Sequence, residues 1–337
     1  MLTTEMCVAL AREAARAPSV HNIQPARWRF TATGEVELFR DVRRTLPVGD
    51  PTGHDLHVSL GAAWEGMAIA CSRHGLVLGA PAHAPTRAST QDSVSAPRLP
   101  DYAPVARATV RDGAMLDPLA PFVDARRSYR GRFIPPRTEA RLALSALAAP
   151  DALLVAGAAD LSTIASFHDF ATWHAESDAA YHAELWSWLR LSPLHPDWSR
   201  DGLNADCLAL SRVERTTARL MLRPRVFSFL SRLGVARLLV RESAQVRSAA
   251  AVVLFAPERT LTPFETGRRF YRLWLEITGA GLYAAPMSAL RDWRAMREAV
   301  ERDFGIGPAR ILANAFRVGD ATTVAISPRM NARLPTA

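Results

Sequence analysis

The 337-residue sequence predicts an α+β protein built from two related halves. Alternating polar and apolar residues on both sides of Gly34 predict a β-hairpin. Several stretches with apolar residues at helical spacing predict long helices, and two of these stretches repeat one pattern. With 49% apolar residues, the chain can bury a core large enough for one big domain or two ordinary ones.

The first third of the chain is predicted to contain two helices and the hairpin. Residues 3–16 are predicted to form a helix, with Leu10 and Ala14, or Ala11 and Ala15, on one face. The hairpin lies in "RWRFTATGEVELFRD", and a strong helix in "DPTGHDLHVSLGAAWEGMAIACSRHGL" ends at Gly75. Residues 80–104 are rich in Pro, Ala, Ser and Thr and are predicted to be a loop or linker.

The rest of the chain alternates predicted helices and strands. Helices are expected near 138–148, from about 160 to 190 and at 265–279. The runs "DALLVAG", "SAAAVVLFA" and "RILANAFRVG" predict strands, the second of them fully buried. Residues 192–204 are predicted to form a turn-rich loop.

Two helical stretches form an internal repeat. "GAAWEGMAIACSRHGL" starts at Gly61 and "GRRFYRLWLEITGAGL" at Gly267; in each, thirteen residues separate the glycine from a Gly-Leu pair, and a proline follows soon after. The match predicts a duplication, with an N-terminal half at 1–115 and a C-terminal half at 116–337. The second half is expected to carry a helical insertion at about 160–245.

The charge pattern argues against nucleic-acid binding. All 41 cationic residues are arginine, and acidic residues are interspersed with them, as in "LRDWRAMREAVERDF", so the formal charge of +8 is not gathered in one patch. No run of 18 apolar residues occurs, and the first residues lack the basic-then-apolar order of a signal peptide. A soluble, cytoplasmic protein without membrane or nucleic-acid partners is expected.

No metal site or disulfide framework is predicted. Cys7, Cys71 and Cys207 are far apart and form no CxxC motif. His174 and His182 are eight positions apart, whereas a helical metal-binding pair needs a spacing of four.

The segment "PSVHNIQP", which begins at Pro18, crowds four polar side chains between two prolines. Ser19, His21, Asn22 and Gln24 on a stiff loop suit the edge of a flat polar ligand. The alternative is an Asx-type turn before a strand, in which Asn22 satisfies local backbone groups and His21 is a partly buried surface residue.

Three motifs together resemble the flavin-dependent nitroreductase family. "PSVHNIQP" is similar to its Pro-Ser-x-x-Asn-x-Gln-Pro segment, "RRSYR" at Arg126–Arg130 to its Arg-x-Ser-x-Arg/Lys segment, and "GLYAAPMSAL" at Gly281–Leu290 to its Gly-Leu…Pro-x-x-Gly turn. The duplicated length resembles the fused subgroup related to mycobacterial Acg-type nitroreductases. The resemblance covers nearly the whole chain.

The resemblance implies a central, mostly antiparallel sheet flanked by helices, with the two halves forming a pseudo-dimer in one chain. In homodimeric members each FMN lies at the subunit interface. One subunit supplies the arginine-serine segment and the proline turn, and the other supplies the asparagine segment. Here the asparagine segment lies in the N-terminal half, and the arginine-serine segment and the proline turn lie in the C-terminal half. The two halves together would therefore form one composite site, so we expect one flavin per chain, in a monomer or a homodimer.

The resemblance also implies roles for individual residues. Arg126 and Arg130 would clamp the FMN phosphate, with a further hydrogen bond from Ser128. For Arg126 and Arg127 the alternative is a solvated helix start. Positive charge near N1 or the phosphate is expected from Arg317, Arg329 and Arg333. The residues expected to bind the cofactor are Pro18, Ser19, His21, Asn22, Gln24, Arg126, Arg127, Ser128, Arg130, Pro286, Met287, Arg317 and Arg329. The catalytic positions are Ser288 and Ala289, whose backbone N–H groups would face flavin N5.

The sequence departs from the family pattern at three places. Ala26 stands where a tryptophan is usual, and Trp28, two residues later, is expected in the core. Ser288 and Ala289 replace the common Glu-Gly, and a backbone angle with positive φ would strain alanine more than glycine. The C-terminal arginines also lack the usual tight spacing.

An aromatic- and histidine-rich region lies in the second half. It is expected to be either a lid over the flavin or a packed helix pair with a loop. Its members are Trp173, His174, Tyr181, His182, Trp186, Trp188, His195 and Trp198.

The activity expected from the resemblance is FMN-dependent hydride transfer. NAD(P)H would be the co-substrate, and the acceptor a nitroaromatic, quinone or enone, or a dedicated metabolite would be oxidised. GxGxxG after a strand, GxxxxGK[ST], GxSxG and HExxH do not occur. Two alternatives remain, a protein that sequesters FMN with little turnover and a scaffold that has lost its flavin.

Overall fold

The computed structural model describes residues 2–84, 101–113, 115–147 and 150–333. The chain divides into two compact units, each with helices and an antiparallel sheet, so the α+β prediction is confirmed. Unit 1 comprises Met1–Asp124, Pro263–Tyr271 and Arg329–Ala337, and unit 2 comprises Ala125–Thr262 and Arg272–Pro328. Part of the predicted linker, residues 85–100, lies outside the described residues.

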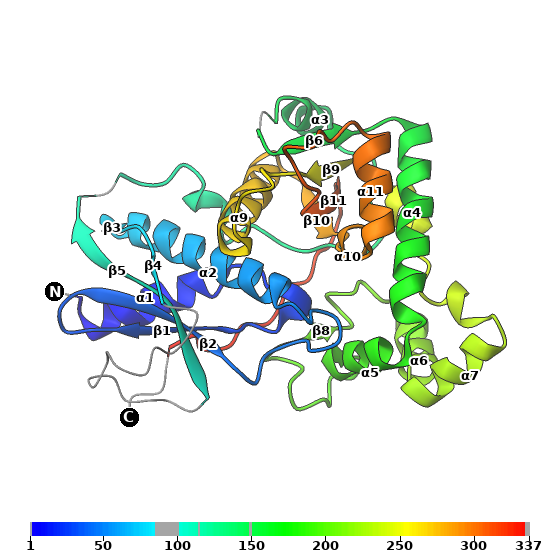
Figure 1. The fold of residues 1–337 in the computed structure, drawn as a ribbon, viewed down its shortest axis with the longest axis horizontal. Helices are drawn as coiled ribbons and strands as arrows, with labels where there is room; N and C mark the ends of the chain where they lie inside the picture. Colours follow the sequence, from blue (N-terminus) through cyan, green and yellow to red (C-terminus); the bar gives the residue numbers. More distant parts are fainter. Residues whose placement is uncertain (1, 85–100, 114, 148–149, 334–337) are drawn as a thin grey trace. The chain divides into compact units, whose positions relative to one another are not determined.

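The sheet of unit 1 has the strand order β1-β2-β5-β3, with β4 also pairing with β5 (Figure 1). Its strands are β1 (Ala26–Phe30), β2 (Glu35–Asp41), β3 (Leu76–Leu78), β4 (Ala82–His83) and β5 (Tyr102–Asp112). The predicted hairpin is confirmed, with Gly34 in the turn at φ 83°. β5 was not predicted, because Pro104 and two arginines interrupt its apolar pattern.

Two helices and the first part of a third belong to unit 1. They are α1 (Thr4–Ala14), α2 (His54–Arg73) and residues Pro263–Tyr271 of α9 (Pro263–Gly279). α2 packs on α1 and on the sheet, and Trp64 of α2 contacts both Trp28 and Phe264, with ring centroids about 6 Å apart. Trp28 is only 1% exposed, which confirms it as a core residue.

The sheet of unit 2 has the strand order β10-β11-β9-β6, all antiparallel (Figure 1). Its strands are β6 (Ala152–Val155), β9 (Ala251–Phe255), β10 (Tyr283–Pro286) and β11 (Asn314–Gly319). All five residues of β9 are buried, as the apolar run predicts. The core beside this sheet includes Ile164, Val252, Leu290 and Val300.

The remaining helices of unit 2 are mostly those of the region at 158–247. The α-helices are α3 (Thr138–Ser145), α4 (Ala158–Glu176), α5 (Ala179–Trp188), α6 (Arg212–Met221), α7 (Pro224–Arg232), α8 (Ser243–Arg247), α10 (Ala289–Asp292) and α11 (Arg294–Asp303). The short 3-10 helices of the chain are η1 (Val20–Asn22), η2 (Ala120–Phe122) and η3 (Ala236–Leu238). In the described part of the chain, no helix is both long and apolar enough to cross a membrane.

The prediction of one helix from about 160 to 190 is wrong. The helix is interrupted between α4 and α5, where the Asp178 carboxylate accepts hydrogen bonds from the N–H groups of Ala180 and Tyr181. An aspartate in this position ends one helix and caps the next. After α5, the two-residue strands β7 (Leu189–Arg190) and β8 (Leu203–Asn204) pair in parallel and bracket the predicted turn-rich loop.

Candidate functional site

The loop between α1 and β1 holds three non-glycine residues in the left-handed backbone region. Their φ angles are 42° at His21, 56° at Asn22 and 50° at Gln24. Each such conformation costs on the order of 1 kcal/mol or more and persists only where the surrounding structure fixes it. Strained backbone of this kind is concentrated at ligand-binding sites. The loop is therefore a candidate binding element.

Arginine side chains and one serine fix the loop from within unit 1. Arg44 Nη1 donates to the carbonyl oxygen of Ile23 at 2.8 Å, and Arg27 Nη1 donates to that of Gln24 at 2.9 Å. The N–H of Gln24 donates to Ser19 Oγ at 2.9 Å. These bonds engage the backbone of Ile23 and Gln24, so side chains from other parts of unit 1 help to hold the loop conformation.

The C-terminal segment of unit 1 binds the two amide side chains of the loop. Arg329 Nη1 donates to Asn22 Oδ1 at 2.9 Å, although the two residues are 307 positions apart. The N–H of Met330 donates to Gln24 Oε1 at 2.8 Å. The structure thus brings together predicted cofactor-binding residues from the two ends of the chain.

A small cavity lies between the loop and this C-terminal segment. Its volume is about 30 Å³, and residues lining it include Pro18, Ser19, Gln24, Trp28, Met330 and Ala332. A cavity of this size holds about one water molecule. The N–H of Trp28 also donates to the carbonyl oxygen of Ala332 at 2.7 Å. The C-terminal segment is therefore packed against the inner side of the loop.

The arginine-serine segment lies in unit 2, beside β10. Ser128 forms a parallel β-bridge with Ala284, and the N–H of Tyr129 donates to the carbonyl oxygen of Ala284 at 3.0 Å. Because Ala284 is two residues before Pro286, the segment runs next to the proline turn. Two motifs more than 150 residues apart in the sequence therefore meet at one edge of the unit 2 sheet.

Arg126 is not part of a solvated helix start, and that alternative is wrong. Its side chain is buried (6% exposed), and no helix covers residues 126–130. Its guanidinium lies 4.6 Å from the ring centroid of Trp274, within the range of a cation–π interaction. Arg127 Nη1 donates to the carbonyl oxygen of Arg126 at 2.8 Å.

Arg317 positions the backbone that carries Arg130. Its guanidinium is 1% exposed and donates to the carbonyl oxygens of Arg130 and Gly131 at 2.7 and 2.8 Å. The Arg130 side chain is partly buried, and burial lowers its pKa. Within the described residues, the Arg130 guanidinium donates no hydrogen bond. A desolvated cation of this kind is suited to an anionic ligand.

Glu242 balances part of this positive charge. Its Oε2 accepts from His168 Nε2 at 3.3 Å and lies 3.8 Å from Arg317 Nη2. Burial favours the neutral form of Glu242. The hydrogen bond from His168 and the charges of Arg317 and Arg130 nevertheless hold the pKa of Glu242 at about 2. The carboxylate therefore stays ionised at neutral pH.

The proline turn ends β10 and starts α10. Met287 is 1% exposed, and its N–H donates to the carbonyl oxygen of Ala315 at 2.7 Å. Ser288 is helical, with φ −61°, and Ala289 is absent from the residues with positive φ, so the strain expected at Ala289 does not occur. Among the described residues, no acceptor lies within hydrogen-bonding distance of the N–H of Ser288 or Ala289. Helix starts leave such donors available.

Several residues of these two regions were missed at the sequence level. Trp274, Glu242, Arg27 and Arg44 hold the motifs in place through contacts with residues far along the chain or on a neighbouring turn. Local spacing carries no signal for such contacts. In the described part of the chain, His, Cys, Asp and Glu side chains form no group of three that could hold a metal ion.

Part of the aromatic- and histidine-rich region is helix packing. The His182 ring stacks on Phe227 with centroids 3.7 Å apart, and His182 Nε2 donates to the carbonyl oxygen of Leu222 at 2.9 Å. The His174 ring stacks on Trp293 at 4.1 Å. These two histidines therefore serve packing between helices of unit 2.

No protein-family model matches the chain, and no curated protein matches it. Among solved structures, the FMN- and NADPH-dependent nitroreductase NfnB from Sphigopyxis sp. strain HMH is similar over 60% of this chain and 88% of that protein, at 16% identity and a TM-score of 0.30. The FMN-dependent nitroreductase NfnB from Mycobacterium smegmatis, solved in complex with NADPH, is similar over 59% of this chain and 86% of that protein, at 19% identity and a TM-score of 0.33.

Proposed function

We propose that this chain binds FMN and transfers a hydride from NAD(P)H to an acceptor of the nitroaromatic, quinone or enone type. The observation that carries the proposal is the pairing of Ser128 with Ala284. This pairing sets an arginine-rich segment beside a turn whose first two N–H groups have no acceptor among the described residues. A flavin mononucleotide needs both kinds of group, cations for its phosphate and amide donors for its ring.

The phosphate is assigned to the arginine-serine segment. FMN carries close to two negative charges on its phosphate, and charge-assisted hydrogen bonds from arginine are the strongest that a protein without lysine can offer. Arg130 fits this role because it is desolvated and donates to no described residue. Arg126 supplies a second cation and Ser128 a hydroxyl donor, while Arg317 fixes the carbonyl groups at Arg130 and Gly131.

The ring is assigned to amide donors. The N–H groups of Ser288 and Ala289 would donate to the ring, where bound FMN supplies two-electron chemistry at N5. Asn22 and Gln24 are also assigned to the ring as donors, because their side-chain oxygens already accept from Arg329 and from Met330. One N–H of Gln24 Nε2 donates to the carbonyl oxygen of Asn22 at 3.4 Å, and the ring would use the other. Donors suit the carbonyl oxygens at the ring edge.

The flavin content of the purified full-length chain tests the proposal. We expect a yellow protein whose released cofactor is FMN, at about one per chain, and which oxidises NAD(P)H in the presence of menadione or a nitrofuran. A colourless protein that does not bind added FMN would exclude the proposal. Preference for NADPH or NADH follows from the same assay.

A second candidate function is FMN sequestration with little turnover. It is favoured by the C-terminal segment that begins at Arg329. This segment packs against the loop between α1 and β1 that contains Asn22, and it leaves a cavity of only about 30 Å³ there. Steady-state oxidation of NAD(P)H by the flavin-loaded protein separates the two functions. Turnover supports the oxidoreductase, and its absence in a fully loaded protein supports sequestration.

A further inference from the structure

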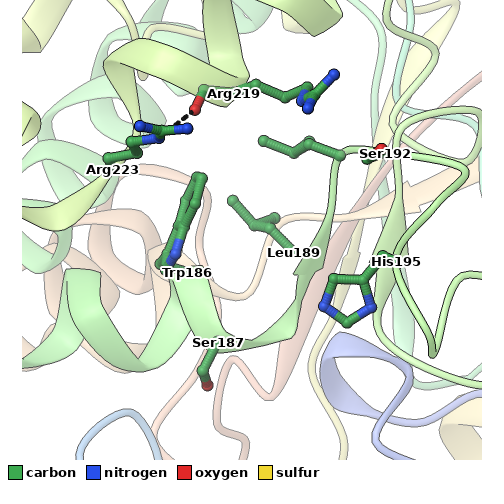
Figure 2. Close-up of a pocket in the computed structure, with 8 residues that line it drawn as sticks. Trp186, Ser187, Leu189, Ser192, His195, Arg219 and Arg223 are labelled. Carbon is green, nitrogen blue, oxygen red and sulfur yellow. Dashed lines mark hydrogen bonds between the residues drawn. The ribbon is translucent and has the colours of Figure 1, made fainter.

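A second cavity lies in unit 2, between the end of α5, the strand β7 with the loop after it, and the end of α6 (Figure 2). Its volume is about 290 Å³, at the lower end of the range of small-molecule sites. Residues lining it include Trp186, Leu189, Leu191, His195, Arg219 and Arg223. None of these residues belongs to the proposed flavin-binding set.

One side of the cavity is apolar. Trp186, Leu189 and Leu191 present ring and alkyl surface, and Figure 2 shows Leu189 between Trp186 and His195. An indole face in a cavity of this size suits a flat ring system of one or two rings, because stacking on tryptophan adds to the burial of apolar area. The apolar side therefore selects for an aromatic ligand.

Two arginines line the other side of the cavity. Arg223 Nε donates to the carbonyl oxygen of Arg219 at 3.1 Å, which ties this side chain to the end of α6 (Figure 2). In the described part of the chain, neither Arg219 nor Arg223 forms an ion pair. By contrast Arg215, one turn earlier on α6, pairs with Asp206.

His195 adds a ring N–H donor. Its Nδ1 accepts from the N–H of Asp197 at 3.1 Å, so Nε2 is the nitrogen that carries a proton. Two arginines and an N–H donor on one cavity, with no carboxylate among the residues that line it, make an environment for an anion.

We propose that this cavity binds a small aromatic carboxylate. The ring lies against Trp186 and the two leucines. The carboxylate accepts from Arg219 and Arg223, whose planar guanidinium groups match its two oxygens. The apolar wall distinguishes such a ligand from inorganic phosphate, which would use the arginines alone.

Calorimetric titration of the purified full-length chain with 1-naphthoate tests the site. We expect binding in the micromolar to low millimolar range, at least about tenfold weaker binding of the uncharged 1-naphthamide, and about tenfold or greater loss in the Arg219→Gln/Arg223→Gln double variant. Trp186→Leu should also weaken naphthoate binding. The matched control is Arg225→Gln, an exposed arginine on α7 that does not line the cavity and should change the affinity less than twofold.

The proposal is overturned by no binding of naphthoate at 10 mM, by equal binding by the double variant with a native circular dichroism spectrum, or by equal affinity for naphthamide. Displacement of naphthoate by phosphate at equal concentration would also overturn it, since the site would then recognise anions only. Flavin content is measured in the same samples. Loss of naphthoate binding at unchanged flavin content concerns this cavity alone, and absence of flavin concerns only the proposed function.

Discussion

Gly61 of helix α2 packs against the backbone of helix α9, and Gly267 of α9 packs in the same way against the backbone of α2. A Cβ on Gly61 would lie 1.8 Å from the carbonyl oxygen of Phe264, and a Cβ on Gly267 would lie 2.0 Å from that of Val58. Each glycine thus contacts the residue three positions before the other. Such reciprocity is the pattern of a two-fold axis. Because these are the first glycines of the two repeats, it supports an internal duplication.

The close contact between α2 and α9 at these two glycines predicts a strong loss of stability when either glycine gains a side chain. In Gly61→Ala and Gly267→Ala the new methyl group overlaps a backbone carbonyl, which cannot rotate away, so the helices must move apart. We expect destabilisation of about 3 kcal/mol or more. Thermal unfolding followed by circular dichroism measures the effect.

Gly307→Ala is the control for this prediction. No heavy atom outside its neighbours lies within 4 Å of a Cβ at that position. We expect its midpoint of unfolding to stay close to that of the parent protein. Equal midpoints for Gly61→Ala and Gly307→Ala would show that the two helices do not cross as closely as described.

Arg126→Ala is predicted to weaken FMN binding by more than tenfold. A hydrogen bond between charged groups contributes roughly 1.5–3 kcal/mol, and the variant also removes the cation that lies over Trp274. Fluorescence titration of the apoprotein with FMN measures the change. Arg141→Ala, an exposed arginine on α3, is the control. An unchanged dissociation constant for Arg126→Ala would refute the phosphate assignment.

Substitutions at Asn22 separate its backbone role from its side-chain role. Glycine adopts the φ of 56° freely, so Asn22→Gly removes the side-chain amide, which accepts from Arg329, without adding backbone strain. Asn22→Leu removes the same group and adds strain of roughly 1–2 kcal/mol. We expect both variants to bind FMN more weakly, and Asn22→Leu to unfold at a lower temperature than Asn22→Gly.

Flavin titration and scanning fluorimetry of the two Asn22 variants measure these effects. Equal unfolding temperatures for the glycine and leucine variants would argue against strain at this position. Unchanged FMN affinity in both variants would leave the loop without a role in flavin binding.

Glu242 gives the protein a pH-dependent stability. The pKa of Glu242 is held at about 2 in the folded protein, below the ordinary value of a glutamate. The depressed pKa adds stability that is fully present above about pH 5 and is lost as pH falls toward 2. In Glu242→Gln this contribution is absent, so the difference in unfolding temperature between the two proteins should shrink over that range.

Unfolding temperatures of the parent protein and of Glu242→Gln between pH 2 and pH 7 check this expectation. Glu298→Gln is the control, because Glu298 pairs with Arg294 on the exposed surface of α11 and such pairs contribute little. A temperature difference for Glu242→Gln that stays constant down to pH 2 would contradict the role given to its charge.

Local patterns in the sequence predicted the longest helices and several of the strands of this fold. The strong helix ended as expected near Gly75, which has a φ of 70° after α2, and the buried run of β9 was confirmed. The break at Asp178 was missed because helical apolar spacing continues across it. A Ser-Asp pair before alanines was the available signal for a helix cap.

The candidate site was predictable in its motifs and unpredictable in its contacts. The loop at His21–Gln24 was found because two prolines and four polar residues mark it, and the turn at Pro286–Ala289 through its resemblance to a family motif. The bond from Arg329 to Asn22 and the support of Arg130 by Arg317 join distant positions through side chains. With 41 arginines in the chain, nothing local distinguishes these two from the others.

Unit 1 is built from three separate stretches of the chain, and this has a consequence for biosynthesis. Its sheet and its first two helices are made early, but Arg329 and Met330, which secure the amides of the asparagine loop, emerge from the ribosome last among its segments. At typical translation rates, the intervening stretch takes roughly 10–40 s to synthesise. Throughout that interval the nascent loop lacks its hydrogen bonds from Arg329 and Met330. Unit 1 therefore completes its structure only after nearly all of unit 2 has been translated.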